Sequence, residues 1–243
     1  MLAESLPGVF VLTGIVRRLP AAQAVNMGAD ILLLDDGFQH LALRRDLDIV
    51  LFNTDKLAGN SRVFPGGDLR EPITALRRCH AFVLTGTDEQ NQERAEKFKK
   101  VLNAKFPEQP VFFSSYRPGG FVLQKTDGEK ISVQPEELAD QRCFAFCGIA
   151  RPESFHRTLN KLAITPVAFC GLPDHFSYPA KTVRQLISDA RQAGATAFLC
   201  TEKDMVKLRH IDMQLPLYAA VMEAQPEKDF IKLILQNKKM RLI

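Results

Sequence analysis

The sequence predicts an α/β fold in which a mostly parallel sheet is flanked by helices. Short apolar runs of strand length alternate along the chain with segments whose apolar residues recur at helical spacing. Several of these runs end in charged residues or glycine, as buried parallel strands do where they open into loops. The 243 residues are 46% hydrophobic, which is enough for one large domain or two small ones with a buried core.

The first half of the chain contains the elements of one α/β lobe. Gly28 and Pro107 stand where two helical segments end. A stretch rich in Gly, Pro and charge at 59–72 is too long for a plain turn, so we expect it to be functional. The expected strands are 9–12, 31–34, 48–52, 81–85 and 111–114, and the expected helices are 20–27 and 90–105.

A break in the alternation of strand and helix patterns separates this half of the chain from the next. Two alternating runs flank Asp127-Gly128, which predicts a β-hairpin. We expect an insertion or hinge at 117–135, between a first lobe at 1–116 and a second α/β lobe at 136–243. In the second lobe Pro152 and Pro179 open helices, and the expected strands are 143–147, 197–201 and 217–221. The apolar spacing predicts the buried faces of the two helices: Phe155, Leu159 and Leu162 in the first, and Val183, Leu186, Ile187 and Ala190 in the second.

The apolar run at 31–34 organises the predicted chemistry, because it is closed by Asp35 and Asp36. A buried parallel strand here would place both carboxylates at the sheet edge where open α/β folds bind ligands. Adjacent carboxylates suit Mg²⁺, which keeps water and phosphate in its other positions. Gln39 and His40 could then orient a phosphate or a nucleophile. The alternative is a turn in which the carboxylates cap the following residues and His40 is a surface residue.

Short motifs in a fixed order connect this stretch to a known family. Together they resemble the tetraacyldisaccharide 4′-kinases, also called lipid A 4′-kinases, over essentially the whole chain. The motifs are DDGFQH at 35–40, RDLDI at 45–49, GNSR at 59–62, PGGDLREP at 65–72, FCGIARP at 146–152, PDHFSY at 173–178 and TEKDMVKL at 201–208.

The resemblance implies a P-loop-NTPase-like fold and an ATP-dependent kinase that uses Mg²⁺. Its reaction would move the γ-phosphate of ATP to the 4′-hydroxyl of the lipid A disaccharide 1-phosphate precursor. The expected partners are this acylated lipid and, weakly, an anionic membrane surface, with no nucleic acid. The expected location is the cytoplasm, at the cytoplasmic face of the bacterial inner membrane.

The same resemblance assigns roles to residues around the nucleotide. Asp35 and Asp36 correspond to carboxylates near Mg²⁺, and Arg70 and Glu71 to a pair near the phosphates and the metal. An arginine fork can neutralise phosphoryl oxygens as charge spreads over them. The alternative for Arg70 and Glu71 is a surface ion pair. The assignment is therefore Asp36, Arg70 and His175 as catalytic, Asp35, Gln39, His40 and Glu71 as cofactor-binding, and Asp35, Asp36 and Glu71 as metal ligands.

His175 is the second centre of the implied chemistry. In the resembled kinases this histidine assists an acidic base that deprotonates the sugar hydroxyl, a sensible role for a carboxylate–histidine pair. We expect the neighbouring Asp174 to point elsewhere. Phe176 departs from the His or Tyr common in the family. In TEKD, we expect Asp204 to cap the following helix, and Lys203 to face either nucleotide or solvent.

One element of phosphate chemistry is missing from the 243 residues. None of the fourteen glycines is followed by lysine, so no G-x-x-x-x-G-K-[ST] loop is present. In the resembled kinases that loop and the acidic base lie N-terminal to the matched region. We therefore expect the chain to correspond to the C-terminal three-quarters of the enzyme. The alternative is a catalytically inactive remnant that folds but lacks both groups.

Composition argues against a nucleic-acid-binding protein and against a zinc site. A formal charge of +4 is too mild for a nucleic-acid footprint. Five cysteines, mostly in apolar runs, indicate buried reduced thiols rather than a zinc site. The basic tail at 228–243 has the pattern of an amphipathic helix. We expect it to dock on its own domain, with any membrane contact weak and sensitive to salt.

Overall fold

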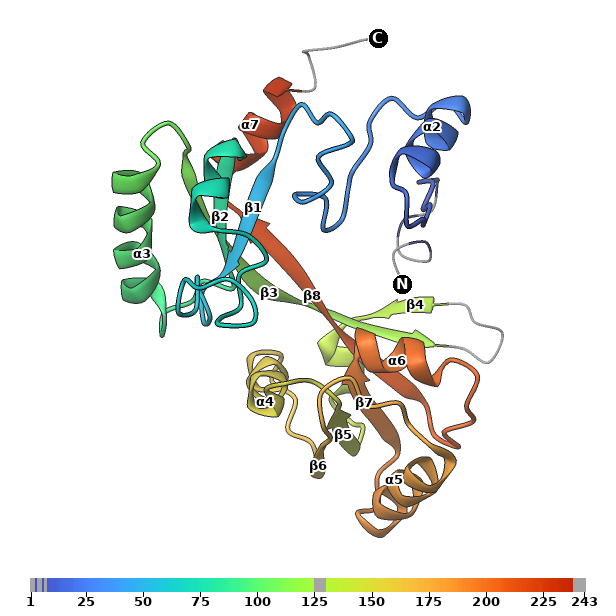
Figure 1. Ribbon diagram of the computed structural model, residues 1–243. Coiled ribbons are helices and arrows are strands. Elements are labelled where there is room, and N and C mark those ends of the chain that lie inside the picture. Colours follow the sequence, from blue (N-terminus) through green and yellow to red (C-terminus); the bar gives the residue numbers. More distant parts are fainter. Residues whose placement is uncertain (1–2, 4–5, 7, 125–129, 238–243) are drawn as a thin grey trace. The chain divides into compact units, whose positions relative to one another are not determined.

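The computed structural model describes residues 3, 6, 8–124 and 130–237 (Figure 1). These residues form two compact units. The N-terminal unit combines the described residues up to 116 with those at 224–237, and the central unit spans the described residues of 117–223. The predicted division at 1–116, 117–135 and 136–243 stays a prediction.

The sheet of the N-terminal unit is parallel. β1 (Ile49–Asn53) pairs with β2 (Ala81–Thr85), and β2 pairs with the first part of β3 (Val111–Gln124). Four of the five residues of β2 are buried, because β2 has a strand on each side. The strands predicted at 48–52, 81–85 and 111–114 are confirmed, although β3 is ten residues longer than the predicted run.

Three helical elements complete this part of the chain. α3 (Gln92–Lys105) buries Ala95 and Leu102 in a cluster with Phe52 and Phe82 of the sheet. α2 (Arg18–Asn26) ends before Gly28, whose φ of +89° only glycine adopts readily. A 3₁₀ helix, η1 (Ile73–Arg78), precedes β2.

Two predicted strands are wrong. Residues 9–12 and 31–34 are irregular, and among the described residues no strand pairs with either. Leu33 is 92% exposed and Ile31 is 52% exposed. An apolar run becomes a buried strand only when neighbours satisfy its backbone groups and cover its faces. Asp35 and Asp36 therefore follow an irregular segment rather than the end of a parallel strand.

β3 passes through the expected break and continues into a hairpin. Its second part pairs in antiparallel fashion with β4 (Lys130–Val133), with Phe121 opposite Val133. Gly120 has a φ of +94°, which lets the strand continue where a side chain would be strained. The predicted pairing is confirmed, and the Asp127-Gly128 turn lies outside the described residues.

The central unit contains four parallel strands: β5 (Cys143–Cys147), β6 (Ala168–Gly171), β7 (Ala197–Thr201) and β8 (Leu217–Pro226). Strands β5 and β7 match their predicted bounds, whereas β6 was not predicted. The hydrogen-bonded order is β1-β2-β3-β8-β7-β5-β6, with β4 on β3. The mostly parallel sheet with flanking helices is thereby confirmed.

Helices pack on this sheet through the predicted faces. α4 (Pro152–Lys161) buries Phe155 and Leu159, and α5 (Ala180–Gln192) buries the four residues predicted for it: Val183, Leu186, Ile187 and Ala190. α6 (Glu202–Leu208) starts directly after β7, and a short 3₁₀ helix, η2 (Pro135–Leu138), precedes β5.

The C-terminal helix α7 (Lys228–Asn237) belongs to the N-terminal unit. Phe230 packs on Phe112 of β3, with ring centroids 5.5 Å apart. Ile231, Ile234 and Leu235 remain 42%, 37% and 56% exposed. The described part of the tail is therefore docked as predicted, with much of its apolar face still exposed.

All five cysteines are free thiols, and four of them are buried. Burial raises the pKa of Cys79 and Cys147 to about 12 and that of Cys143 to about 11. None of the described helices is long and apolar enough to cross a membrane.

Candidate active site

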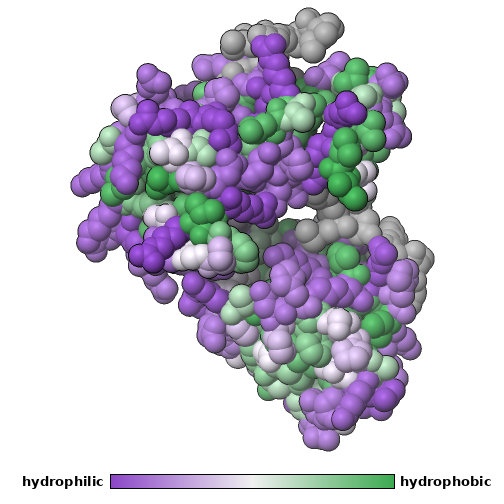
Figure 2. Space-filling model, viewed as in Figure 1, coloured by the Kyte–Doolittle hydropathy of each residue, from purple (hydrophilic) through white to green (hydrophobic). Residues whose placement is uncertain are grey.

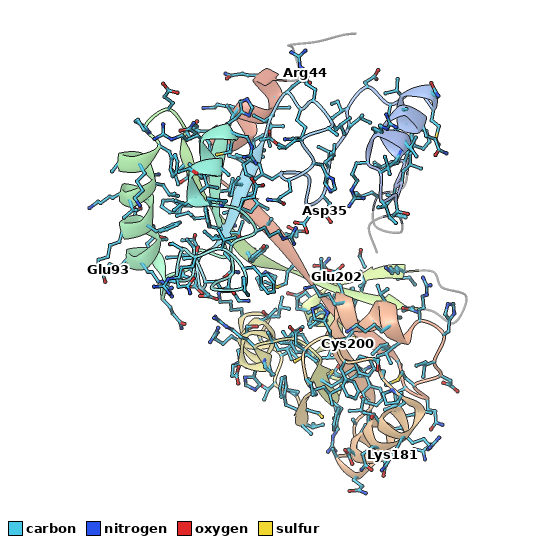
Figure 3. The ribbon with its side chains drawn as sticks, viewed as in Figure 1. Asp35, Arg44, Glu93, Lys181, Cys200 and Glu202 are labelled. Atoms are coloured by element: carbon cyan, nitrogen blue, oxygen red, sulfur yellow. The ribbon has the colours of Figure 1, made fainter. Side chains whose placement is uncertain are left out.

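The DDGFQH segment is a tight turn on the N-terminal unit, with Asp35 at its start (Figure 3). Asp36 has a φ of +52°, in the left-handed region that few non-glycine residues adopt. A Cβ atom on Gly37 would lie 2.7 Å from the Cβ of Leu34, so only glycine fits the turn. Strain of this kind concentrates at functional sites, and it appears here at a predicted catalytic residue.

Asp36 and Arg70 form the contact that unites two motifs. A guanidinium nitrogen of Arg70 donates to Asp36 Oδ2 at 3.0 Å across 34 residues of sequence. The two side chains are 64% and 69% exposed, so solvent screens the pair and it adds little stability. Its consequence is geometric, because it holds a carboxylate and a guanidinium together at an open surface.

Glu71 has a different partner. Both of its carboxylate oxygens accept from Arg78, at 2.8 and 3.1 Å. The Arg78 guanidinium also lies over the ring of Phe38, 4.7 Å from its centroid. Since Phe38 packs on the core of this unit, Arg78 links Glu71 to the DDGFQH turn.

The other end of the turn is held by Arg45. One guanidinium nitrogen donates to the carbonyl oxygens of His40 and Leu43 at 2.6 and 2.9 Å. Its Nε donates to Asp48 Oδ1 at 2.6 Å, and both side chains are nearly buried. This ion pair therefore anchors the segment that carries Gln39 and His40 to the start of β1.

The loop at 59–72 is built by internal hydrogen bonds. Asn60 donates to the carbonyl of Gly66 at 2.8 Å and accepts from the backbone N–H of Arg62 at 3.0 Å. A Cβ atom on Gly67 would clash with Asn60 Oδ1 and with the Arg62 carbonyl oxygen, so this glycine is required. The loop presents Arg70 to Asp36.

The carboxylates fit a magnesium site only in part. Within the described residues, no group of three or more metal-ligating side chains is assembled. Glu71 is bound to Arg78 and Asp36 to Arg70. Adjacent Asp35 and Asp36 still form an exposed oxygen donor set of the size Mg²⁺ uses when phosphates fill its remaining positions.

His175 lies in the central unit, on the segment between β6 and α5. It has a φ of +57° and its side chain is 85% exposed. Asp174 Oδ1 accepts from the His175 backbone N–H at 3.0 Å, and Asp174 Oδ2 lies 3.9 Å from His175 Nε2. The expectation that Asp174 points elsewhere is therefore wrong, because the left-handed backbone folds the imidazole back toward this carboxylate.

Asp204 differs from its expected role. The N-cap of α6 is Thr201, whose hydroxyl accepts from the Asp204 N–H at 3.3 Å. Asp204 itself is fully buried, and its Oδ2 accepts from the Thr201 hydroxyl at 2.6 Å and from the Gly148 N–H at 3.1 Å. It joins two strand ends instead of capping the helix.

The chain matches the family model described as tetraacyldisaccharide-1-P 4′-kinase over residues 1–239. A tetraacyldisaccharide 4′-kinase of Desulfotalea psychrophila is 40% identical over 98% of this chain and 67% of its own length. The chain belongs to the tetraacyldisaccharide 4′-kinase family. A second kinase of that name, from Syntrophus aciditrophicus, is 36% identical over 98% of this chain and 66% of its own.

A solved structure supports the same membership. The crystal structure of an "apo" form LpxK from Aquifex aeolicus in complex with ATP matches with a TM-score of 0.68 and 26% identity. The match covers 97% of this chain and 67% of that one, and it confirms the P-loop-NTPase-like α/β fold. The chain thus spans about two thirds of the length of these tetraacyldisaccharide 4′-kinases.

Within this kinase family's motifs, the structure brings some predicted site residues together and leaves others apart. Asp36 contacts Arg70, whereas Glu71 contacts Arg78, which the sequence analysis did not single out. Arg45 was likewise quoted only as part of a motif. Its signal was an arginine three residues before an aspartate, five residues after the end of the DDGFQH segment.

Proposed function

We propose that this chain acts in a tetraacyldisaccharide 4′-kinase, moving the γ-phosphate of ATP to the 4′-hydroxyl of an acylated disaccharide 1-phosphate. The Asp36–Arg70 pair carries the proposal, because it joins the DDGFQH and PGGDLREP motifs of a kinase family at one exposed surface. Phosphoryl transfer requires such positioned charges more than covalent chemistry. The comparisons name kinases and lend no support to the alternative of an inactive remnant.

In this proposal Arg70 neutralises charge on the transferring phosphoryl group. Its planar guanidinium can exchange the single bond to Asp36 for bidentate bonds to phosphoryl oxygens. Gln39 and His40 lie at the end of the turn that Arg45 anchors and would contact the nucleotide. ATP is thus the expected phosphate donor.

Mg²⁺ would be held by Asp35 and Asp36 and would neutralise phosphate charge when bound. Glu71 can join as a ligand only if its pair with Arg78 opens. Arg78 therefore decides whether Glu71 faces the metal or stays tied to the DDGFQH turn.

His175 would take part in removing the proton of the sugar hydroxyl. Its imidazole is exposed and therefore open to a substrate hydroxyl, and Asp174 Oδ2 lies 3.9 Å from Nε2, so a carboxylate–histidine pair of the kind used in general base catalysis is present. The lipid acceptor resides in a bilayer, so we also propose that the protein works at the cytoplasmic face of the bacterial inner membrane and contacts it weakly.

Phosphate transfer from γ-labelled ATP to a tetraacyldisaccharide 1-phosphate tests the proposal in the protein read from the complete reading frame. Asp36→Asn and Arg70→Lys are each expected to lower kcat about 10²-fold or more without lowering the melting temperature. Asp229→Asn is the matched control, because Asp229 is also an exposed partner of an ion pair, with Lys232 at 2.7 Å. Unchanged turnover in Asp36→Asn and Arg70→Lys would refute the proposed site.

A further inference from the structure

Asp204 is the one fully buried carboxylate among the described residues, and the proposed reaction does not use it. It lies at the start of α6, while its bonding partners belong to the ends of two neighbouring strands. Its Oδ2 atom accepts from the Thr201 hydroxyl and from the Gly148 N–H. A buried charge is costly unless it is well paired, so this position calls for an explanation.

The second oxygen of Asp204 faces the segment that carries His175. A Cβ atom on Gly148 would lie 3.1 Å from Phe176 Cβ, 3.2 Å from Asp204 Oδ1 and 3.3 Å from the Pro173 carbonyl oxygen. These three atoms therefore surround Gly148 closely. Pro173 and Phe176 therefore lie against the same glycine whose N–H donates to Asp204.

Tyr178 closes the other end of this segment. It is buried, and its ring meets Phe146 and Phe176 edge-on at centroid distances of 5.8 and 5.4 Å. Burial, and then the charge of Asp204, raise the pKa of its hydroxyl. Neither Tyr178 Oη nor Asp204 Oδ1 has a hydrogen-bond partner in the part of the chain that the structure describes. Lys207 is near both, with Nζ 3.6 Å from Asp204 Oδ1 and 5.8 Å from the Tyr178 ring centroid.

His175 and Tyr178 both have left-handed backbones, with φ of +57° and +55°. Such conformations persist only where surrounding contacts enforce them. The exposed His175 side chain has few contacts of its own, so its position is set by the partly buried Phe176 and the buried Tyr178 that follow it. Phe176 lies against Gly148 and against the ring of Tyr178.

We propose that Asp204 is a positioning residue for the proposed reaction, holding the segment 173–178 so that His175 is presented in one orientation. This inference rests on the proposed role of His175. Its physical content is independent of that role: the carboxylate fixes Gly148, Gly148 seats Pro173 and Phe176, and the His175 backbone follows. Lys207, which is partly exposed, offsets the buried negative charge of Asp204.

The test compares Asp204→Asn with Asp212→Asn, the same chemical change at an exposed residue of the same unit. Hydrogen exchange of the backbone amides at 174–178 and the NMR signals of the His175 imidazole are measured in the 243-residue chain. Asp204→Asn is expected to speed exchange in this segment by about tenfold or more and to move the imidazole signals. Asp212→Asn is expected to change neither.

Gly148→Ala supplies a second route, because its added methyl pushes Phe176 and Pro173 without removing the carboxylate. It is expected to move the same imidazole signals, which keeps the proposal testable if Asp204→Asn does not fold. Unchanged His175 signals in both variants would overturn the inference. In the active enzyme, Asp204→Asn should lower kcat at unchanged KM for ATP. Shifted His175 signals with unchanged kcat would uphold the positioning contact and refute the role of His175 instead.

Discussion

The two units treat the same kind of sequence differently. In the central unit the apolar run 143–147 is β5, with all five residues buried between β6 and β7. In the N-terminal unit the apolar runs at 9–12 and 31–34 are irregular, and Figure 2 shows hydrophobic surface near α2 among polar residues. Ile15 and Leu33 are 96% and 92% exposed. An apolar run therefore favours burial, but it forms a strand only where adjacent strands pair with its backbone.

The largest expected effect concerns activity. The 243 residues tested by themselves are expected to show no measurable transfer of phosphate from ATP to the lipid acceptor, a loss of at least about 10³-fold relative to a relative such as the Desulfotalea psychrophila kinase. The reason is that they contain no glycine-rich loop ending in Lys-Ser/Thr to cradle the phosphates. Turnover comparable to that of the relative would show that another element performs this task.

The difference in packing can be measured directly. Leu159→Ala in the central unit removes a fully buried side chain and is expected to lower the free energy of unfolding by about 2–5 kcal/mol. Leu33→Ala in the N-terminal unit is expected to change it by less than about 0.5 kcal/mol, because that side chain is already exposed. Urea denaturation of both variants gives the comparison. Equal losses would mean that the run at 31–34 is buried in solution.

Arg45→Ala probes what holds the DDGFQH turn without touching the proposed reacting groups. Its loss removes an ion pair and two bonds to carbonyl oxygens, so we expect about 1–3 kcal/mol less stability and a higher KM for ATP. Arg44→Ala is the matched control, as a neighbouring arginine at an exposed position. An unchanged KM in Arg45→Ala would make its contacts irrelevant to the nucleotide.

The two units differ in their number of cysteine thiols, and stability at alkaline pH tests this difference. Four of the five cysteines lie in the central unit, and all five have raised pKa values in the folded chain. Above about pH 9 the unfolded chain ionises these thiols while the folded chain keeps them protonated. Fewer protons are then bound in the unfolded state, so stability is expected to fall as the pH rises from about 9 toward 12. Urea midpoints of the wild type and of Cys147→Ala across this range test it, and the variant should lose less.

The sequence predicted the regular elements well where local pattern and environment agree. The bounds of β2, β5 and β7 and the four inward residues of α5 follow from apolar periodicity alone. β6 was not predicted, because Ala168–Gly171 is short and follows Pro166 closely. The strand expected at 31–34 failed because its pairing partners are not a property of its own residues.

The candidate site was predictable only in part, for a related reason. The apolar run at 31–34 and the two carboxylates after it indicated Asp35 and Asp36 as site residues. The partner of Asp36 lies 34 residues away, and only the family motifs suggested Arg70. The pairing of Glu71 with Arg78 depends on the turn of η1. The left-handed backbones of Asp36, His175 and Tyr178 are likewise set by tertiary packing. Local sequence gave the chemistry of these side chains, and the fold decided their partners.

The smallest expected effect concerns α7. Its Phe230 is docked on Phe112, while Ile231, Ile234 and Leu235 stay exposed next to Lys228 and Lys232. An exposed apolar face with flanking lysines favours an anionic bilayer, but only by about 1 kcal/mol per basic residue, and salt screens that attraction.

We therefore expect weak binding to vesicles that contain anionic lipid, lost at about 0.5 M salt. The double variant Lys228→Gln/Lys232→Gln should weaken the binding measured by co-sedimentation by up to about 30-fold, since two charges contribute about 2 kcal/mol at most. Lys97→Gln, on the exposed face of α3, is the matched control. Binding that resists salt and survives the double variant would mean that the three exposed apolar side chains, rather than the lysines, hold the membrane. In that case the contacts of α7 with its own unit, such as that between Phe230 and Phe112, would be too weak to keep it docked at the bilayer.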